Sequence, residues 1–516
     1  MNEQADWSDG YVTEIDYTYG YYGELNPMRA QWALLEAGYD PLPPGPEGRL
    51  CCELGFGQGL AFNIHAAAQP GAWWGTDFNP SHAAFAQRLA QASGARVTIA
   101  DDTFAEFAAR TDLPQFDFIV LHGIWSWVSA ENRQVIVDFL RRRLKVGGMV
   151  YASYNTLPGW TSGLPLRHLM FEHANSQGAP GSGMVQRVDA ALAFAQALLD
   201  VNPATLRANP QVAARLERVK KYDRHYLAHE FFNADWQPMY FSDVARLLAP
   251  AKLTFAASAA PLYNLKAINA TPEQQALIDD IRDPVLRETV RDFCVNEQFR
   301  RDYWVRGAPR LKPQEIQRRM SELRVLLLTD PAKVKLTVPG PTGELTLREE
   351  FYRPILDELS DHRVRTVAEL QQKLSHTVNW LQLREAIGVL IGLGALGIAQ
   401  SDADMVRQTH ATSRLNQHLM DMSRTRDDIS WLASPVTGGG VSVTRTEQFF
   451  LAARAAQMNP STWGSYAWAQ LRANGERMLR DGNTLSTDEE MADLNAQAAT
   501  FETEKLGVLK ALKVAG

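Results

Sequence analysis

The sequence of 516 residues is long enough for three or four domains. With 45% hydrophobic and 22% charged residues, its composition is that of an ordinary globular protein with ample core. The net charge of −7 argues against a broad nucleic-acid-binding surface, although a local basic patch is compatible with that average. The three cysteines exclude a disulfide framework and indicate a reducing compartment.

The sequence shows no membrane or metal signal. Its first residues are acidic and lack the apolar core of a signal peptide. The longest apolar run, Ala386–Ala399, is too short and too rich in glycine to span a bilayer. We therefore expect a cytoplasmic protein without a membrane span. The histidines and cysteines are not grouped at metal-ligand spacing, so we expect no metal site.

The N-terminal segment, residues 1–45, is unusually rich in tyrosine. Five tyrosines crowd around Gly20 and Gly23, namely Tyr11, Tyr17, Tyr19, Tyr21 and Tyr22. If this segment is extended, side chains two residues apart share a face, so Tyr17, Tyr19 and Tyr21 lie together. A helix is expected from about Met28. We expect the segment to form a lid over a ligand site; the alternative is simple packing against the core.

A glycine-rich turn follows the first predicted strand, residues 49–54. In a dinucleotide-binding loop of pattern G-x-G-x-x-G, the third glycine after Gly55 and Gly57 would stand at position 60, which is Leu60. Here the third glycine is Gly59, and Glu53 precedes the loop. The pattern E-x-G-x-G-x-G resembles the cofactor loop of class I S-adenosylmethionine (SAM) methyltransferases. A carboxylate at this place suits the cationic amino-acid tail of SAM better than a pyrophosphate.

The following segments alternate between predicted strands and helices. Strands are expected at residues 72–76, 96–100, 116–121 and 149–154, and helices at residues 60–69, 81–92 and 131–144. This alternation predicts a doubly wound α/β sheet that binds ligands at the carboxyl ends of its strands. We therefore expect a Rossmann-like class I SAM methyltransferase fold.

The rest of the chain is predicted to be mostly helical. We expect the methyltransferase domain at 46–265, with a helical insertion at about 160–235 and a further strand of the same sheet at 252–257. Residues 266–345 read as a helical regulatory region, apart from a strand at 333–338. Residues 346–402 resemble a winged-helix module, with Thr366 and Glu369 spaced as a capping box. Residues 403–516 are predicted to form a helical domain with a glycine hinge at 438–440.

Four further blocks identify a narrower family: Leu121–Val128, Ser153–Trp160, His229–Asn233 and Ala433–Val436. They are similar to bacterial methyltransferases with a methyltransferase regulatory domain, a group that includes the lysine methyltransferases of rickettsial outer-membrane proteins. The His-Gly-x-x-Ser-Trp and Tyr-Asn-x-x-Pro-Gly-Trp blocks are the most specific. The resemblance implies SAM as cofactor and a protein lysine as acceptor.

Candidate cofactor residues stand on the glycine loop and at the strand ends. Asp77 follows the second strand at the position that binds ribose hydroxyls, although Asp is also a common helix cap. After the third strand, one of two aspartates is expected to accept from the adenine amino group while the other caps a helix. The full set is Glu53, Gly55, Gly57, Gly59, Asp77, Phe78, Asp101, Asp102, Thr103 and His122.

Candidate catalytic residues are expected near the methyl donor. His122 ends the fourth strand and can orient substrate or act as a base; a structural role is equally compatible with the sequence. Trp125 can form an aromatic wall that attracts a cationic acceptor, or pack under the insertion. Tyr154 ends the fifth strand beside the substrate. A hydroxyl of Tyr17 or Tyr19 can orient the acceptor nucleophile.

The leading hypothesis is methyl transfer to a protein lysine. The atypical tyrosine-rich segment favours an alternative, O- or N-methylation of a glycan or small metabolite. A second alternative is a SAM-sensing or regulatory binding protein without turnover. The acidic balance and the absence of an Arg/Lys-dense recognition helix in 366–392 count against DNA as a partner. A homodimer is compatible with the sequence.

Overall fold

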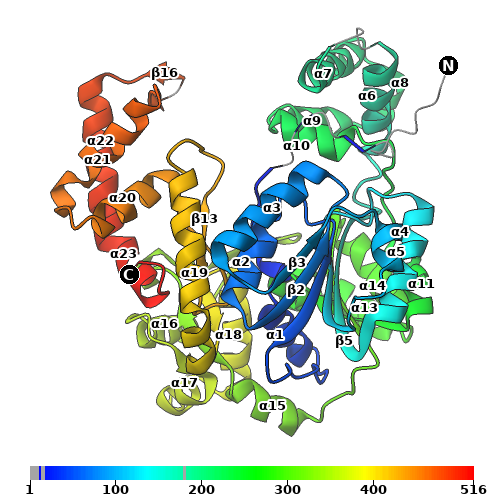
Figure 1. Cartoon of the computed structure of the whole chain (residues 1–516). Coiled ribbons are helices and arrows are strands. Elements are labelled where there is room, and N and C mark those ends of the chain that lie inside the picture. Colours follow the sequence, from blue (N-terminus) through cyan, green and yellow to red (C-terminus); the bar gives the residue numbers. More distant parts are fainter. Residues whose placement is uncertain (1–10, 13–14, 16–17, 178–181, 481, 516) are drawn as a thin grey trace.

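The computed structural model describes residues 11–12, 15, 18–177, 182–480 and 482–515. Its centre is a seven-stranded sheet of order β3-β2-β1-β4-β5-β7-β6 (Figure 1). The first five strands run parallel: β1 (Arg49–Leu54), β2 (Gly71–Thr76), β3 (Val97–Ala100), β4 (Phe116–Leu121) and β5 (Leu144–Asn155). This is the expected Rossmann-like methyltransferase sheet.

Two layers of helices cover the sheet (Figure 1). One face packs against α1 (Pro27–Glu36), α2 (Leu60–Ala68) and α3 (Pro80–Ser93). The other face packs against α4 (Phe104–Ala109), α5 (Ala130–Arg143) and α11 (Phe241–Leu248). Because side chains alternate along a strand, Cys51 lies in the first layer and Cys52 in the second. The adjacent cysteines therefore belong to separate cores.

One of the last two strands of the sheet lies beyond the expected domain boundary at residue 265. The expected strand at 252–257 is present as β6 (Leu253–Ser258). The strand β7 (Phe299–Arg306) lies between β5 and β6 and runs antiparallel to both. Helix was predicted for residues 266–345 apart from a strand at 333–338, and this prediction is wrong for β7. Its charged residues resemble a solvated helix face, but two of them, Arg300 and Asp302, are buried.

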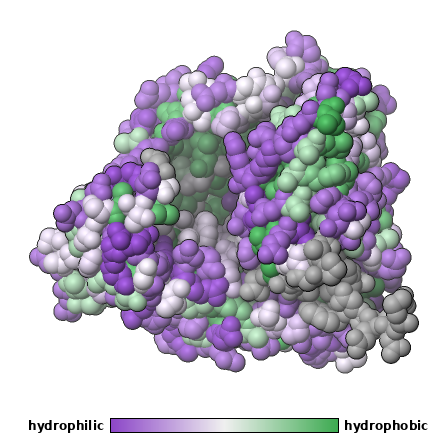
Figure 2. All heavy atoms as spheres, turned by 90° about the horizontal axis from the view of Figure 1, so that it is seen from above, coloured by the Kyte–Doolittle hydropathy of each residue, from purple (hydrophilic) through white to green (hydrophobic). Residues whose placement is uncertain are grey.

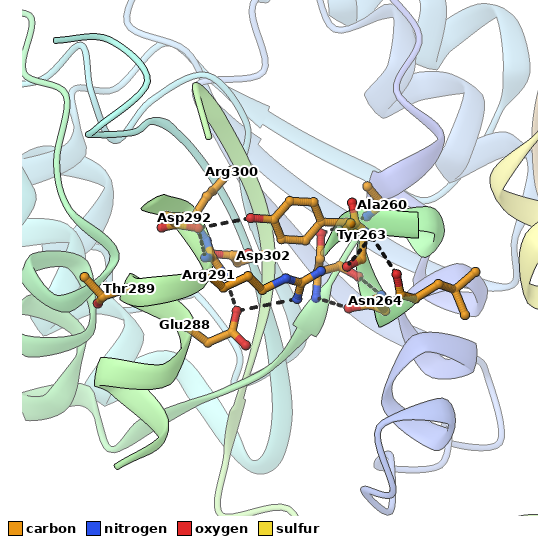
Figure 3. Close-up of polar contacts among 12 residues, drawn as sticks. Ala260, Tyr263, Asn264, Glu288, Thr289, Arg291, Asp292, Arg300 and Asp302 are labelled. Atoms are coloured by element: carbon orange, nitrogen blue, oxygen red, sulfur yellow. Dashed lines mark hydrogen bonds and ion pairs between the residues drawn. The ribbon is translucent and has the colours of Figure 1, made fainter. Parts of the chain in front are cut away.

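A buried ion cluster holds β7 to the helix that precedes it (Figure 3). The guanidinium of Arg300 contacts Asp302 at 2.8 Å, Asp292 at 2.6 Å and Glu288 at 3.0 Å. Asp292 and Glu288 stand on α14 (Pro284–Val295). Tyr263 donates a hydrogen bond to Asp292 at 3.0 Å, and burial raises the pKa of this aspartate to about 7. One cation thus compensates three carboxyl groups from two elements.

The helical insertion forms a small unit with its own apolar core. It consists of α6 (Leu164–Ser176), α7 (Met184–Asp200), α8 (Ala204–Ala208), α9 (Gln211–Val219) and α10 (Arg224–Phe231). Val12 of the N-terminal segment and Trp160 belong to the same core. Helical structure in this insertion agrees with the sequence prediction.

The region after β7 combines helices with short strands. It contains α15 (Pro313–Ser321), the hairpin β9 (Thr337–Gly340) and β10 (Gly343–Thr346), and the helices α16 (Glu349–Glu358), α17 (Val367–Leu374) and α18 (Trp380–Gly392). A three-stranded antiparallel sheet joins β11 (Arg365–Thr366), β8 (Arg324–Leu327) and β12 (Leu396–Ala399). The capping box of Thr366 and Glu369 is present at α17. Two short helices, α12 (Lys266–Asn269) and α13 (Pro272–Asp280), precede α14.

The C-terminal part is mainly helical and stands on the opposite side of the sheet from the insertion (Figure 1). Its helices are α19 (Asp402–Met422), α20 (Arg445–Ala455), α21 (Trp463–Ala473), α22 (Thr487–Thr500) and α23 (Leu506–Ala511). Two hairpins join them, β13 (Trp431–Ser434) with β14 (Gly439–Ser442) and β15 (Leu479–Arg480) with β16 (Asn483–Thr484).

The predicted glycine hinge at 438–440 is wrong. Gly439 and Gly440 belong to β14, where Tyr21 packs directly on their backbone. A Cβ atom on Gly440 would lie 2.8 Å from the Tyr21 ring, so a side chain here would displace the tyrosine.

No described helix is both long and apolar enough to cross a membrane.

Replacing Arg300 with Met should strongly destabilise the sheet, because it leaves the buried carboxyl groups of Asp292 and Asp302 without their cation. We expect a loss of about 3–5 kcal/mol in the free energy of unfolding, measured by urea denaturation. The control is Arg246→Met, which removes an exposed ion pair with Asp243 on α11 and should cost no more than about 1 kcal/mol. Equal losses for the two variants would show that the cluster does not stabilise the fold.

Candidate functional site

A cavity of about 380 Å³ lies at the carboxyl ends of the parallel strands. Residues that follow β1, β2, β3 and β4 form its floor, and the N-terminal segment and the insertion contribute the remaining walls. Seen from above, this side of the molecule is broadly hollowed, and apolar side chains are visible within the hollow (Figure 2). The carboxyl ends of the strands, where ligand binding was expected, thus share one cavity with the N-terminal segment and the insertion.

The glycine loop has the backbone that its sequence requires. Gly57 has a φ of 57° and Gly59 a φ of 70°, both in the left-handed region that favours glycine. A Cβ atom on Gly59 would lie 2.6 Å from Cβ of Ala86, so this glycine also permits close packing of α2 on α3. Gly57 borders the cavity, where the absence of a side chain leaves its backbone open to a ligand.

Asp77 fixes this loop to the end of β2. Its Oδ2 accepts a hydrogen bond from the backbone N–H of Gly57 at 2.8 Å. Its Oδ1 accepts one from the N–H of Asn79 and lies 3.1 Å from Nδ1 of His82. Asn79, not Asp77, caps α3, because its side chain accepts from the N–H of Ser81. The alternative of Asp77 as the helix cap is therefore wrong.

Glu53 is a buried carboxyl group that lacks a compensating cation. It is 3% exposed, and its Oε2 has no hydrogen-bond partner among the described residues. Burial, together with the charge of Asp77, raises the pKa of Glu53 to about 8. An orphaned carboxyl oxygen at the edge of a cavity fits the ammonium group of an amino-acid tail.

The residues after β3 divide between the cavity and the surface. Asp102 and Thr103 border the cavity, whereas Asp101 is exposed and does not. The cap of α4 is Thr103, paired with Glu106 in a capping box. The expectation that one of the two aspartates caps this helix is therefore corrected. Phe78 borders the cavity at the end of β2.

His122 borders the cavity at the end of β4 and contacts two tyrosines. Its ring centre lies 3.8 Å from that of Tyr22, and its Nδ1 lies 3.1 Å from the hydroxyl of Tyr151. Burial lowers the pKa of His122 to about 4, so the imidazole is neutral at physiological pH. A neutral ring does not repel a cationic ligand.

Two candidate catalytic residues lie in the core and not beside the cavity. Trp125 is fully buried in the apolar layer around α5 and α11. Tyr154 is also fully buried and donates a hydrogen bond to Asp302 at 2.7 Å, as part of the Arg300 cluster. The nearby Trp127 does border the cavity. The prediction that Trp125 and Tyr154 are catalytic is therefore wrong, and both residues have structural roles in the core.

The tyrosine-rich segment presents a different face to the cavity than the sequence analysis expected. Thr18, Gly20 and Tyr22 border the cavity. Tyr19 points away, with its ring centre 5.1 Å from that of Phe85. Tyr21 lies on that same outer side, against His65 and Trp431. The prediction that side chains of this segment alternate between two faces is confirmed, but the face with Tyr19 is turned away from the cavity. Tyr17 lies outside the described residues.

The N-terminal segment borders the cavity as expected, but Tyr11 was not among the predicted site residues, and the contribution of the insertion was missed. Tyr11 borders it beside Phe78 and His229, with ring centres 5.7 Å and 5.5 Å away. Glu230 and Asp235 border it from the insertion. The His229–Asn233 block was identified as a family signature. Because Glu230 lies within this block, the block could have indicated that Glu230 belongs to the site.

The carboxyl groups of the cavity are its main electrostatic feature, although one of them, on Asp102, contacts Arg110 at 3.3 Å outside the lining. The described lining of the cavity contains no lysine or arginine. It contains five carboxyl groups, those of Glu53, Asp77, Asp102, Glu230 and Asp235. The described residues also contain no group of three or more His, Cys, Asp or Glu side chains arranged to hold a metal ion.

Comparison with known proteins identifies the family. Residues 52–148 match the model of a methyltransferase domain, and residues 223–306 match that of a predicted methyltransferase regulatory domain. A Synechocystis protein is 38% identical over 513 residues, which cover 98% of this chain and 99% of that protein. The chain is a SAM-dependent methyltransferase with a regulatory domain.

Two rickettsial proteins are also similar to this methyltransferase, one in sequence and one in fold. A Rickettsia prowazekii protein is 25% identical over 301 residues, 56% of this chain and 51% of that protein. The structure of PKMT2 from Rickettsia typhi in complex with AdoHcy matches with a TM-score of 0.70. At 16% identity it covers 96% of this chain and 100% of that one, so almost the whole fold is shared.

The cavity fits SAM, the cofactor of this family. The open backbone at Gly57 and the orphaned carboxyl oxygen of Glu53 are the features that support the fit. We propose that Glu53 holds the amino group, Asp77 the ribose hydroxyls and Asp102 the adenine amino group. Phe78 and Thr103 would border the nucleoside.

Replacing Gly57 with Val should abolish SAM binding, because the side chain strains the left-handed backbone and blocks approach of the ligand. We expect a loss of at least a hundredfold in affinity, about 2.8 kcal/mol, by calorimetry. The matched control is Gly475→Val. Gly475 has a similar φ of 72°, so the backbone strain is similar, but no atom lies within 4 Å of an added Cβ and the residue does not border the cavity. Normal SAM binding by the Gly57 variant would refute the cofactor assignment.

Binding of SAM should release a proton from Glu53. With a pKa of about 8, the free carboxyl is mostly protonated at pH 7, and an ammonium group beside it favours the ionised form. Affinity should therefore rise with pH up to about 8 and fall above it, where the ammonium group of the ligand loses its own proton. Calorimetry in two buffers of different ionisation enthalpy measures the released proton.

The variant Glu53→Gln should remove this proton release, whereas Glu344→Gln, at an exposed position on β10, should leave it unchanged. Equal proton release by the Glu53 variant and the wild-type protein would assign the titration to another group.

Proposed function

We propose that this enzyme transfers the methyl group of SAM to a lysine side chain of a protein. The observation that carries the proposal is the charge of the cavity, five carboxyl groups without a lysine or arginine in its described lining. Such a cavity attracts a cationic acceptor and disfavours a phosphate or carboxylate acceptor. The resemblance to the rickettsial lysine methyltransferases supports the same acceptor.

The outer part of the cavity is suited to receive an ammonium group. Glu230 and Asp235 come from the insertion, which is far from the glycine loop in the sequence. Trp127 and Tyr22 add aromatic faces, which attract cations. We infer that the carboxylates draw the lysine in and that the aromatic side chains bind its aliphatic stem.

The aromatic side chains of the cavity favour the neutral amine that methyl transfer requires. SAM supplies an electrophilic methyl group, and a lysine with its reference pKa of about 10.4 must lose a proton before it can attack. Enclosure by Tyr22, His122 and Trp127 lowers the pKa of an entering amine by desolvation. Since its own pKa is near 4, His122 can orient the amine by a hydrogen bond but cannot store its proton.

The acceptor class can be tested with radiolabelled SAM. Incubation of the enzyme with host lysate should label a protein band, and acid hydrolysis should recover the label as methylated lysine. Label confined to small molecules or glycans would favour the alternative acceptor. SAM binding without transfer to any fraction would favour a sensor.

Neutralising the two outer carboxylates should weaken acceptor binding selectively. We expect Glu230→Gln with Asp235→Asn to raise KM for a lysine-containing protein substrate by about tenfold, because both changes remove attraction for an ammonium group. SAM affinity should stay unchanged. Steady-state kinetics and calorimetry measure the two effects.

The matched control is Glu217→Gln with Asp189→Asn. It removes the same charge from exposed ion pairs on the insertion, where little effect is expected. An equal rise in KM for both double variants would indicate a general charge effect and contradict the assigned acceptor site.

A further inference from the structure

A second cavity, of about 490 Å³, lies between the tyrosine-rich segment and the C-terminal half of the chain. Tyr21 and Arg29 border it on the N-terminal side. The strand β12, the hairpin β13–β14 and the helix α23 border it on the other sides, and Leu396, Val441 and Leu509 contribute to a largely apolar wall. An apolar cavity with few polar groups is typical of a small-molecule site.

The charge of this second cavity is opposite to that of the first. Its described lining contains two cations, Arg29 and Lys505, and no aspartate or glutamate. The charge of Lys505 is compensated, because its Nζ lies 2.5 Å from Glu447. Arg29 has no ion pair or hydrogen bond among the described residues, and its Nε is buried without a partner.

The surroundings of Arg29 do not neutralise it. Arg29 interacts electrostatically with the carboxylate of Glu24. That carboxylate also forms an ion pair with Arg301, at 2.5 Å. Burial opposes ionisation of Glu24, but Arg301 and Arg29 together hold its pKa below the ordinary value. One carboxylate therefore serves two guanidinium groups and leaves a surplus positive charge. Arg29 is partly buried, and its Nε, which is buried, is a donor that costs free energy while it has no partner.

A second orphaned donor lies on the same cavity. The hydroxyl of Thr437 is buried and has no hydrogen-bond partner among the described residues. It comes from the turn of the β13–β14 hairpin, and its backbone carbonyl accepts a hydrogen bond at 3.0 Å from Asn26, the cap of the helix that carries Arg29. Two unsatisfied donors from distant parts of the chain thus border one apolar space.

We propose that this cavity is a second ligand site, for a small organic anion that carries a carboxylate on a compact apolar body. The guanidinium of Arg29 and the hydroxyl of Thr437 would donate hydrogen bonds to the carboxylate, and the apolar wall would take the body. A guanidinium matches the geometry of a carboxylate well. The site is independent of the acceptor proposed for methyl transfer.

The two cavities are separated by the tyrosine-rich segment itself. Tyr21 borders the second cavity, whereas its chain neighbour Tyr22 borders the first and packs against His122. An anion in the second cavity therefore contacts the segment that also covers the methyl-transfer cavity, without occupying the SAM site.

The proposal can be tested by ¹⁹F NMR with 3-(4-fluorophenyl)propionate as the probe, in the presence of saturating SAM. The matched uncharged probe is 3-(4-fluorophenyl)propionamide. The acid should bind saturably and roughly tenfold or more tighter than the amide, because only the acid compensates Arg29. This comparison uses the wild-type protein and needs no variant.

Variants then assign the binding to the cavity. Arg29→Met should weaken the acid roughly tenfold or more, and Thr437→Val should weaken it by a smaller factor. Arg363→Met, at a side chain that is 83% exposed, is the control and should bind the acid normally. Equal affinities for acid and amide, absence of saturable binding by the acid, or unchanged binding by both cavity variants would overturn the proposal.

Discussion

An excess of carboxyl groups within an enclosed cavity is the constraint on which the enzyme's chemistry depends. Burying a carboxylate is costly unless a partner compensates it. Asp77 has such partners, since its oxygens accept from the glycine loop and the start of α3. No cation among the described residues lies beside Glu53, and its raised pKa reflects that deficit. The missing positive charge is therefore expected from ligands, and both SAM and a lysine acceptor carry one.

The fold concentrates these charges by joining distant segments. The parallel sheet aligns the residues after four strands, and Asp77 orders the loop that follows the first. The insertion adds acidic residues from beyond position 228, and the tyrosine-rich segment covers the space between. Because side chains alternate along this segment, Tyr22 faces the acidic cavity and Tyr21 the basic one. One short segment thus separates two sites of opposite charge.

The sequence predicted local features well and the partners of individual side chains poorly. Glycine spacing and strand ends are local signals, and they identified Glu53, Gly57, Asp77 and His122, which all border the cavity. The strand β7 was missed because its charged residues satisfy each other in a cluster that only the tertiary structure assembles. For the same reason, the sequence could not show that Tyr154 bonds inward to Asp302.

The decisive measurement is a crystal structure with S-adenosylhomocysteine and a lysine-containing peptide. We expect the cofactor's amino group to lie within hydrogen-bond distance of Glu53. We also expect the lysine Nζ to enter between Tyr22 and Trp127 on the side of Glu230 and Asp235. A cofactor whose amino group points away from Glu53, or a peptide bound outside the acidic cavity, would contradict these expectations.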